Sequence, residues 1–177
     1  AAALQTKLTG HWVEVLDVTD KEGLLSLVER VMARYGRIDI LVNNAVAYTE
    51  RPVHKCTDDE WESTIDSALS AVFRACRAVL PGMMQARSGS IVNLASINQI
   101  VANPNLAAYT AAKGGIHALT KQMTVEYGPF GIRCNAISPG LIMTARTAEG
   151  RSKADLKLDA EAYPIGRVGM PDDVAWA

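Results

Sequence analysis

Apolar residues recur at three- and four-residue spacing in three stretches of the chain, which is the spacing of one face of a helix. The first stretch opens where Thr19 and Glu22 stand at capping-box spacing, and it ends at Gly36. The second opens at a similar pair, Thr57 and Glu60. The pattern therefore predicts helices over residues 19–35, 57–80 and about 105–127, with Pro81-Gly82 ending the second and Gly128-Pro129 the third.

Four short apolar runs alternate with these helices, and in the run 38–42 the apolar residues do not alternate with polar ones. Such runs suit strands covered on both faces, as in a parallel sheet. Strands that alternate with helices indicate a doubly wound α/β sheet. The runs cover residues 13–16, 38–42, 90–94 and 132–137.

The remaining segments complete one predicted domain. Residues 1–8 have the pattern of a helix tail closed by Gly10, and Pro171 begins a helix that the last residue interrupts after one turn. The polar stretch 146–159 is expected to be a mobile loop or lid. Because no repeat or linker is visible, residues 1–177 are interpreted as a single domain that is incomplete at both ends.

Composition excludes several classes of protein. The chain has 177 residues, of which 49% are hydrophobic, and this length buries roughly 70% of the unfolded surface, so disorder is excluded. A net charge of −1 argues against nucleic acid or an anionic membrane as a partner. No apolar run approaches the ~20 residues of a membrane span. Scattered histidines suggest no metal site, and Cys56, Cys76 and Cys134 fit reduced thiols in a cytoplasmic protein.

The spacing of Tyr109 and Lys113 is the most informative chemical signal. Four positions apart on one helix face, the ammonium lies near the phenol. Burial together with this cation is expected to lower the phenol pKa from about 10 toward neutrality, so that the tyrosine can exchange a proton with an alcohol or carbonyl oxygen. Taken alone, the pair is better explained as a surface Tyr/Lys pair. Ser96 changes the balance because it follows the strand at 90–94, where ligands of parallel sheets bind, although it could also bond its own loop.

These residues belong to a longer ordered pattern that resembles the short-chain dehydrogenase/reductase superfamily over essentially all 177 positions. Each motif has a purely structural explanation, such as a helix-terminal charge for Asp17 or a turn for Pro139-Gly140, and their joint order favours the family. The matches are Asp17-Val18-Thr19-Asp20, Asn43-Asn44-Ala45, Gly89-Ser90-Ile91-Val92-Asn93 with Ser96, Tyr109 with Lys113, Asn135-Ala136-Ile137-Ser138-Pro139-Gly140 with Thr144, and Gly166-Arg167 before Pro171-Asp172-Asp173-Val174-Ala175.

The resemblance implies a Rossmann-like three-layer fold and interconversion of an alcohol and a carbonyl compound with NAD or NADP. By this likeness Tyr109 is the acid/base, Ser96 holds the substrate oxygen, and Lys113 bonds the nicotinamide ribose. The same likeness implies a homodimer or homotetramer built through the helices at 57–80 and 105–127. The implied cofactor-binding residues are Asp17 and Val18 at the adenine, Asn44, Ala45 and Val46 at the ribose side, Tyr109 and Lys113, and Pro139, Gly140, Ile142 and Thr144 at the nicotinamide.

Departures from the family pattern motivate an alternative. Ala68 stands where the family usually has an asparagine of a proton relay, and Val46 stands where a glycine is usual. The glycine-rich phosphate turn and the first two strands are expected to lie outside the sequence, which leaves the cofactor preference open. The strand at 13–16 would then lack its neighbours, so either those segments exist beyond the sequence, which we favour, or a sheet edge is exposed. The alternative function is a non-catalytic binding or assembly subunit, or an inactive fragment.

Overall fold

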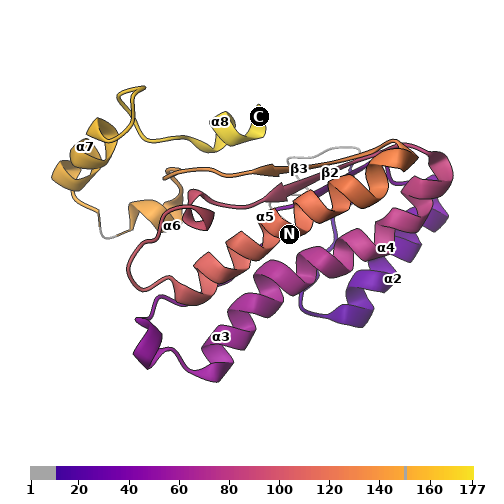
Figure 1. Ribbon diagram of the computed structural model, residues 1–177, viewed down its shortest axis with the longest axis horizontal. Coiled ribbons are helices and arrows are strands. Elements are labelled where there is room, and N and C mark those ends of the chain that lie inside the picture. Colours follow the sequence, from indigo (N-terminus) through magenta and orange to yellow (C-terminus); the bar gives the residue numbers. More distant parts are fainter. Residues whose placement is uncertain (1–10, 150) are drawn as a thin grey trace.

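A parallel sheet forms the centre of the computed structural model, which describes residues 11–149 and 151–177. Its strands are β1 (Ile40–Asn43), β2 (Gly89–Leu94) and β3 (Ile132–Ile137), in the order β1-β2-β3. Both pairings are parallel, with Ile40 opposite Ser90 and Gly89 opposite Ile132. The carboxyl ends of the strands therefore meet at one edge of the sheet, as the alternating pattern predicted (Figure 1).

Long helices cover one face of this sheet (Figure 1). They are α2 (Lys21–Tyr35), α3 (Asp58–Ile65), α4 (Ala71–Ala86) and α5 (Ala107–Tyr127), and a π-helical segment, Asp66–Ser70, joins α3 to α4. Short 3-10 turns lie at Val53–Lys55, Ile97–Gln99 and Gly128–Phe130. Among the described residues, the segment after β3 lies on the opposite side of the sheet, with α6 (Ala145–Ala148), α7 (Lys153–Glu161) and α8 (Pro171–Ala175).

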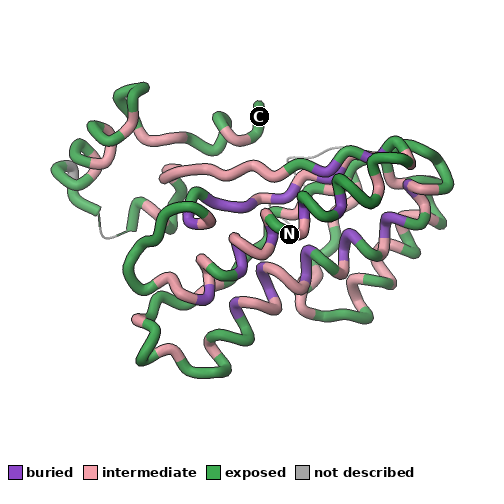
Figure 2. Tube along the Cα trace, in the orientation of Figure 1, coloured by how far each residue is buried: buried purple, intermediate pink, exposed green. Residues whose placement is uncertain are grey.

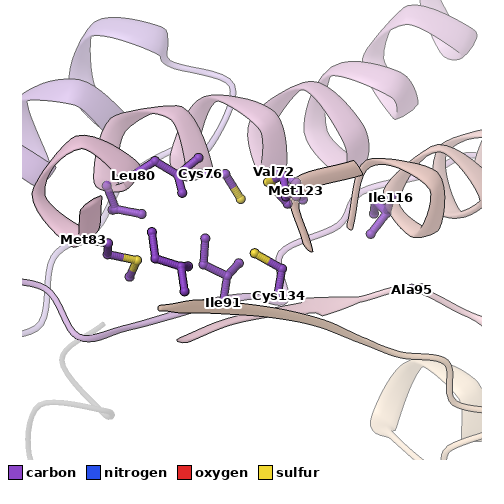
Figure 3. Close-up of a cluster of buried hydrophobic side chains, with 11 residues drawn as sticks. Val72, Cys76, Leu80, Met83, Ile91, Ala95, Ile116, Met123 and Cys134 are labelled. Carbon is purple, nitrogen blue, oxygen red and sulfur yellow. The ribbon is translucent and has the colours of Figure 1, made fainter. Parts of the chain in front are cut away.

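The core lies between the helices and the sheet. Leu80 and Met83 of α4 point toward Ile91 of β2 and Cys134 of β3 (Figure 3), and buried positions concentrate along this side of the molecule (Figure 2). Ile91 is fully buried, whereas Ile40 and Val42 of β1 are 65% and 58% exposed. Packing on the helical face therefore holds the sheet, and the other face of β1 is open to solvent.

The predicted strand at residues 13–16 is not formed. This segment carries no strand, and the Val15 side chain is 80% exposed. It runs instead beside α2, where Glu14 pairs with Arg30 at 3.0 Å and Arg34 lies 5.3 Å from the Trp12 ring centroid. A strand requires a neighbouring strand for its backbone hydrogen bonds, and within the described residues β1 pairs only with β2. Among the described residues, β1 is thus an edge strand of the sheet.

Two predicted helix boundaries are wrong. Asp20, rather than Thr19, caps α2, because its carboxylate accepts a hydrogen bond from the Gly23 N–H at 3.0 Å. Pro81 does not end α4, which continues to Ala86 and closes at Arg87 with a φ of 50°. The proline is exposed while Leu80 and Met83 beside it are buried. Burial of two large apolar side chains, about 1.5–3 kcal/mol each, offsets the ~3 kcal/mol that an internal proline costs.

The prediction of a loop over residues 146–159 is also wrong, because most of this stretch belongs to the helices α6 and α7. Local caps explain the difference: Thr144 accepts from the Thr147 N–H at 3.2 Å, and Ser152 accepts from the Asp155 N–H at 3.2 Å. The predicted helix beginning at Pro171 is confirmed, and so is the left-handed cap at Gly36, with a φ of 78°. The predicted helix tail at residues 1–8 lies outside the described residues.

The capping box at Thr57 is confirmed and yields a stability prediction. Thr57 Oγ1 accepts from the Glu60 N–H at 3.2 Å, and Glu60 Oε2 accepts from the Thr57 N–H at 3.1 Å. Thr57→Ala leaves one of these donors without its partner, so it should lower the free energy of unfolding by about 1 kcal/mol. Urea unfolding measures the change. Thr49→Ala, at an exposed threonine outside the helices, is the control, and equal stability of the two variants would contradict the assignment of the cap.

Candidate functional site

A cleft of about 910 Å³ opens at the carboxyl ends of the three strands. The cleft also extends along the open face of the sheet, from Ser90 and Arg133 near the beginnings of β2 and β3. Its other walls come from the loops that follow β1, β2 and β3, from one face of α5, and from the segment carrying α6 and α8. Most of the residues singled out in the sequence line it. They are Asn44, Val46, Ser96, Tyr109, Lys113, Pro139, Gly140, Ile142 and Thr144.

Three predicted residues, Asp17, Val18 and Ala45, do not line this cleft. Asp17 accepts hydrogen bonds from the Thr19 N–H at 2.9 Å and the Thr19 hydroxyl at 2.7 Å, and these bonds hold the Asp17 pKa below its ordinary value. The carboxylate thus organises the turn before α2. Asn43 also has a structural role, because its amide donates to Asn93 Oδ1 at 2.8 Å across β1 and β2.

Ser96 lies directly after β2, where it caps the 3-10 turn Ile97–Gln99. It is 7% exposed, and its Oγ accepts a hydrogen bond from the Asn98 N–H at 3.2 Å. The loop explanation is therefore confirmed, and Ser96 also lines the cleft, as its position after β2 predicted. The loop bond uses a lone pair of the hydroxyl, and its proton stays available to an acceptor in the cleft.

Lys113 is buried inside α5, with 4% of its surface exposed. Its Nζ donates a short hydrogen bond to the Leu94 carbonyl and lies 5.6 Å from the Tyr109 ring centroid. Burial penalises the charged ammonium and lowers the Lys113 pKa to about 8. The predicted proximity of ammonium and phenol is thus present, and one strand end anchors the lysine.

The prediction that the Tyr109 pKa is lowered is wrong. Burial raises the pKa, because the phenolate loses more solvation than the neutral phenol. A hydrogen bond with Ser96 and the positive charge of Arg146 act in the opposite direction and are weaker. We had expected burial to lower the pKa of the phenol. Burial raises the pKa of any acid that is neutral when protonated, because it disfavours the charged form. Tyr109 consequently carries its proton at neutral pH.

Two cleft residues, Tyr48 and Arg146, were missed in the sequence. The Tyr48 ring lies 4.6 Å from the Tyr109 ring, centroid to centroid, at an interplanar angle of 50°. Arg146 Cζ lies 4.0 Å from the Tyr48 ring centroid. The position of Tyr48 shortly after β1 was a usable signal, since residues beyond strand ends face the ligand side. Arg146 carried no such signal, because it lies on a helix that had been assigned to a loop.

The two departures from the family pattern occupy different surroundings. Ala68 is fully buried in the π-helical segment, so position 68 offers no polar side chain to the site. The neighbouring Ser67 donates to the Ala47 carbonyl at 2.9 Å and holds the loop after β1. Val46 lies on that loop, is 37% exposed, and lines the cleft.

Several known proteins are similar to this chain in sequence and in fold. A family model described as enoyl-(acyl carrier protein) reductase matches residues 1–177. The chain belongs to the short-chain dehydrogenase/reductase superfamily. Similar members include the 3-oxoacyl-(acyl-carrier-protein) reductase FabG of Thermotoga maritima, 38% identical over 161 residues, which cover 91% of this chain and 65% of that protein. Another is the trans-4-hydroxycyclohexanecarboxylate dehydrogenase of Sinomonas cyclohexanicum, 40% identical over 153 residues, which cover 85% of this chain and 59% of that protein.

Solved structures confirm the predicted Rossmann-like fold of this superfamily member. The crystal structure of gox2181 has a TM-score of 0.88 and 36% identity, covering 99% of this chain and 70% of that one. A gluconate 5-dehydrogenase from Burkholderia cenocepacia J2315, in complex with NADP and tartrate, has a TM-score of 0.85 and 30% identity, covering 92% and 64%. The chain thus spans 65% of the length of the Thermotoga relative. Within the described residues, no helix is long and apolar enough to cross a membrane.

Proposed function

We propose that this superfamily member is an NAD(P)-dependent oxidoreductase that interconverts an alcohol and a carbonyl compound. The observation that carries the proposal is the meeting of Ser96, Tyr109 and Lys113 in one cleft at the carboxyl end of a parallel sheet. They come from two elements: Ser96 follows β2, and the other two lie on α5. The relatives named as dehydrogenases and reductases support the same reaction class.

The chain's own groups supply the proton chemistry. During reduction, the Tyr109 hydroxyl donates its proton to the carbonyl oxygen, and Ser96 Oγ donates a hydrogen bond to the same oxygen. The raised Tyr109 pKa keeps the phenol protonated at neutral pH, which suits it to this direction. Oxidation of an alcohol requires the phenolate, so its rate should increase with pH. Position 68 is an alanine, so the proton returns to Tyr109 without help from that side chain.

The cleft fits a nicotinamide cofactor, which when bound supplies or accepts the hydride. Lys113 has an ammonium with several donors, of which one serves Leu94 O among the described residues, so donors remain for a ribose hydroxyl. Asn44 and Val46 line one side, and Pro139, Gly140, Ile142 and Thr144 line the other. Two similar proteins, ElxO and the gluconate 5-dehydrogenase, have NADP bound in their solved structures. Asp17, Val18 and Ala45 remain proposed contacts of the adenosine end.

A coupled assay tests the reaction class. The purified protein is mixed with NADH or NADPH and a panel of ketones, aldehydes and oxo acids, and the absorbance of the reduced nicotinamide is followed. We expect oxidation of one nucleotide that depends on the carbonyl compound. Nucleotide binding without turnover across the panel would instead support the non-catalytic subunit that Ala68 and Val46 suggested.

We further propose that the protein acts as a homodimer or homotetramer in the cytoplasm. Trp61 of α3 and Phe73 of α4 are 42% and 46% exposed on the helical face, which leaves apolar surface for a second copy. A stripe of small residues on α5, including Ala111 and Gly114, permits close helix packing. Light scattering at micromolar concentration should give at least twice the chain mass. A monomer would remove this assembly.

A further inference from the structure

The cleft has an uneven charge. Three basic side chains, Lys113, Arg133 and Arg146, are among the residues that line it, and no Asp or Glu is among them. The whole chain has a net charge of −1, so this concentration of positive charge is local. A cleft lined by one sign of charge raises the local concentration of oppositely charged ligands. The lining therefore favours an anion.

The three cations differ in how far their donors are used. Lys113 is buried and bonded to the Leu94 carbonyl. Arg133 lies near the beginning of β3, away from the carboxyl edge, and donates to Ser90 Oγ at 3.1 Å. Arg146 donates one bond, to the Tyr48 carbonyl at 3.3 Å. Arg146 is thus the cation that combines free donors with a place beside the proposed acid/base.

Arg146 is oriented although no carboxylate holds it. It follows Thr144, which caps α6, and its guanidinium lies over the Tyr48 ring at 4.0 Å. The ion pairs formed among residues 11–149 and 151–177 do not include Arg146. A guanidinium that stacks on an aromatic face keeps its edge open for a planar or tetrahedral anion. Among the residues that the structure describes, Arg146 is therefore a cation held by ring stacking and not paired with a carboxylate.

The position of Arg146 relative to the reaction centre is set by two ring contacts. The Tyr48 ring centroid lies 4.0 Å from Arg146 Cζ and 4.6 Å from the Tyr109 ring centroid. The charge of Arg146 also reaches the Tyr109 hydroxyl, whose pKa it lowers. A ligand group bound by Arg146 would therefore lie near Tyr109, within the same cleft.

We propose that Arg146 binds an anionic group of the substrate, so that the protein acts on hydroxy or oxo compounds that carry a carboxylate. This inference rests on the proposed oxidoreductase function. A phosphate ester shares the chemistry that Arg146 recognises, and the experiments below separate the two anions.

The first experiment compares two ketones of the same shape and different charge. With 4-oxocyclohexanecarboxylate, Arg146→Met should lower kcat/KM about 10–100-fold, mostly through KM, because a charge-assisted bond is lost. With 4-oxocyclohexanecarboxamide, kcat/KM should stay unchanged, which also controls for an altered Tyr109 pKa. Arg146→Lys should restore part of the carboxylate preference. Equal effects on both ketones, or none on the carboxylate, would overturn the inference.

The control variant is Arg34→Met. Arg34 also lies over aromatic rings, 5.3 Å from the Tyr35 centroid, but it is on α2 and does not line the cleft. Removing it changes the net charge by the same amount and removes the cation–π contacts with Trp12 and Tyr35. The ratio of kcat/KM for the two ketones should remain that of the unaltered protein.

A binding experiment separates this inference from the proposed function, because it needs no turnover. Tartrate should raise the melting temperature of the unaltered protein and of Arg34→Met, while Arg146→Met should show no rise; threitol, the neutral analogue, should have no effect on any of them. Inorganic phosphate acting more strongly than tartrate at equal concentration would assign the site to a phosphate ester. If tartrate binds through Arg146 and no carbonyl compound is reduced, the anion site stands and the proposed function fails. A tartrate response that Arg146→Met leaves unchanged would reject the anion site.

Discussion

Tyr109→Phe should lower kcat for carbonyl reduction by about 10²–10⁴-fold while leaving nucleotide binding intact. The substitution removes one oxygen atom and keeps the ring, so the contact with Tyr48 at 4.6 Å is retained. What is lost is the proton that the carbonyl oxygen receives. Steady-state rates measure the first effect, and quenching of nucleotide fluorescence measures the second.

Tyr48→Phe provides the matched control for this experiment. It deletes the same atom from the neighbouring ring and leaves the stack with Arg146 in place. We expect its rate to stay within a few-fold of the unaltered protein. A Tyr109→Phe variant with a near-normal rate would reject Tyr109 as the proton donor, and equal losses in both variants would point to ring packing instead.

Lys113→Met should abolish turnover and stabilise the fold. The ammonium is 4% exposed, and burial lowers its pKa from 10.5 to about 8. Holding a charge where its pKa is lowered costs free energy, about 3 kcal/mol for a shift of this size. Loss of the bond to the Leu94 carbonyl takes back part of the gain. At neutral pH the free energy of unfolding should rise by about 1–3 kcal/mol.

The stability difference between Lys113→Met and the unaltered protein should depend on pH. Below pH 8 the lysine is charged in both the folded and the unfolded chain, so the full penalty applies. Between about pH 8 and 10.5 the unfolded chain binds more protons, and the stability of the unaltered protein rises toward that of the variant. Lys121→Met, on the exposed side of α5, should change stability little at any pH. A Lys113→Met variant that is less stable at neutral pH would show that the lysine supports the fold.

Several features of the site were accessible from local sequence alone. The Thr57 box, the Gly36 cap and the strands near 90–94 and 132–137 follow from side-chain chemistry within a few residues. The i,i+4 spacing of Tyr109 and Lys113 places both on one side of α5, because a helix repeats about every 3.6 residues. A serine directly after a parallel strand has to lie at the ligand edge of the sheet. Consequently, the sequence alone predicts that Ser96, Tyr109 and Lys113 lie close together.

Other features depend on contacts between distant residues. Arg146 and Tyr48 are 98 positions apart, and nothing local marks either as the other's partner. Pro81 stays inside α4 because the sheet buries Leu80 and Met83, and residues 13–16 do not form a strand because they lie beside α2 rather than beside β1. The sign of the Tyr109 pKa shift also depends on how completely the fold removes water from the phenol.

The α/β class, the caps at Gly36 and Thr57, and the proposal that Ser96, Tyr109 and Lys113 meet in one site all follow from the sequence. Those features depend on backbone periodicity and on hydrogen bonds between near neighbours. The positive charge of the cleft and the stacking of Arg146 on Tyr48 depend on the folded structure. The directions of the Tyr109 and Lys113 pKa shifts depend on it as well. The burial of a side chain and its electrostatic interactions depend on all the atoms around it. Those atoms come from residues that are distant in the sequence.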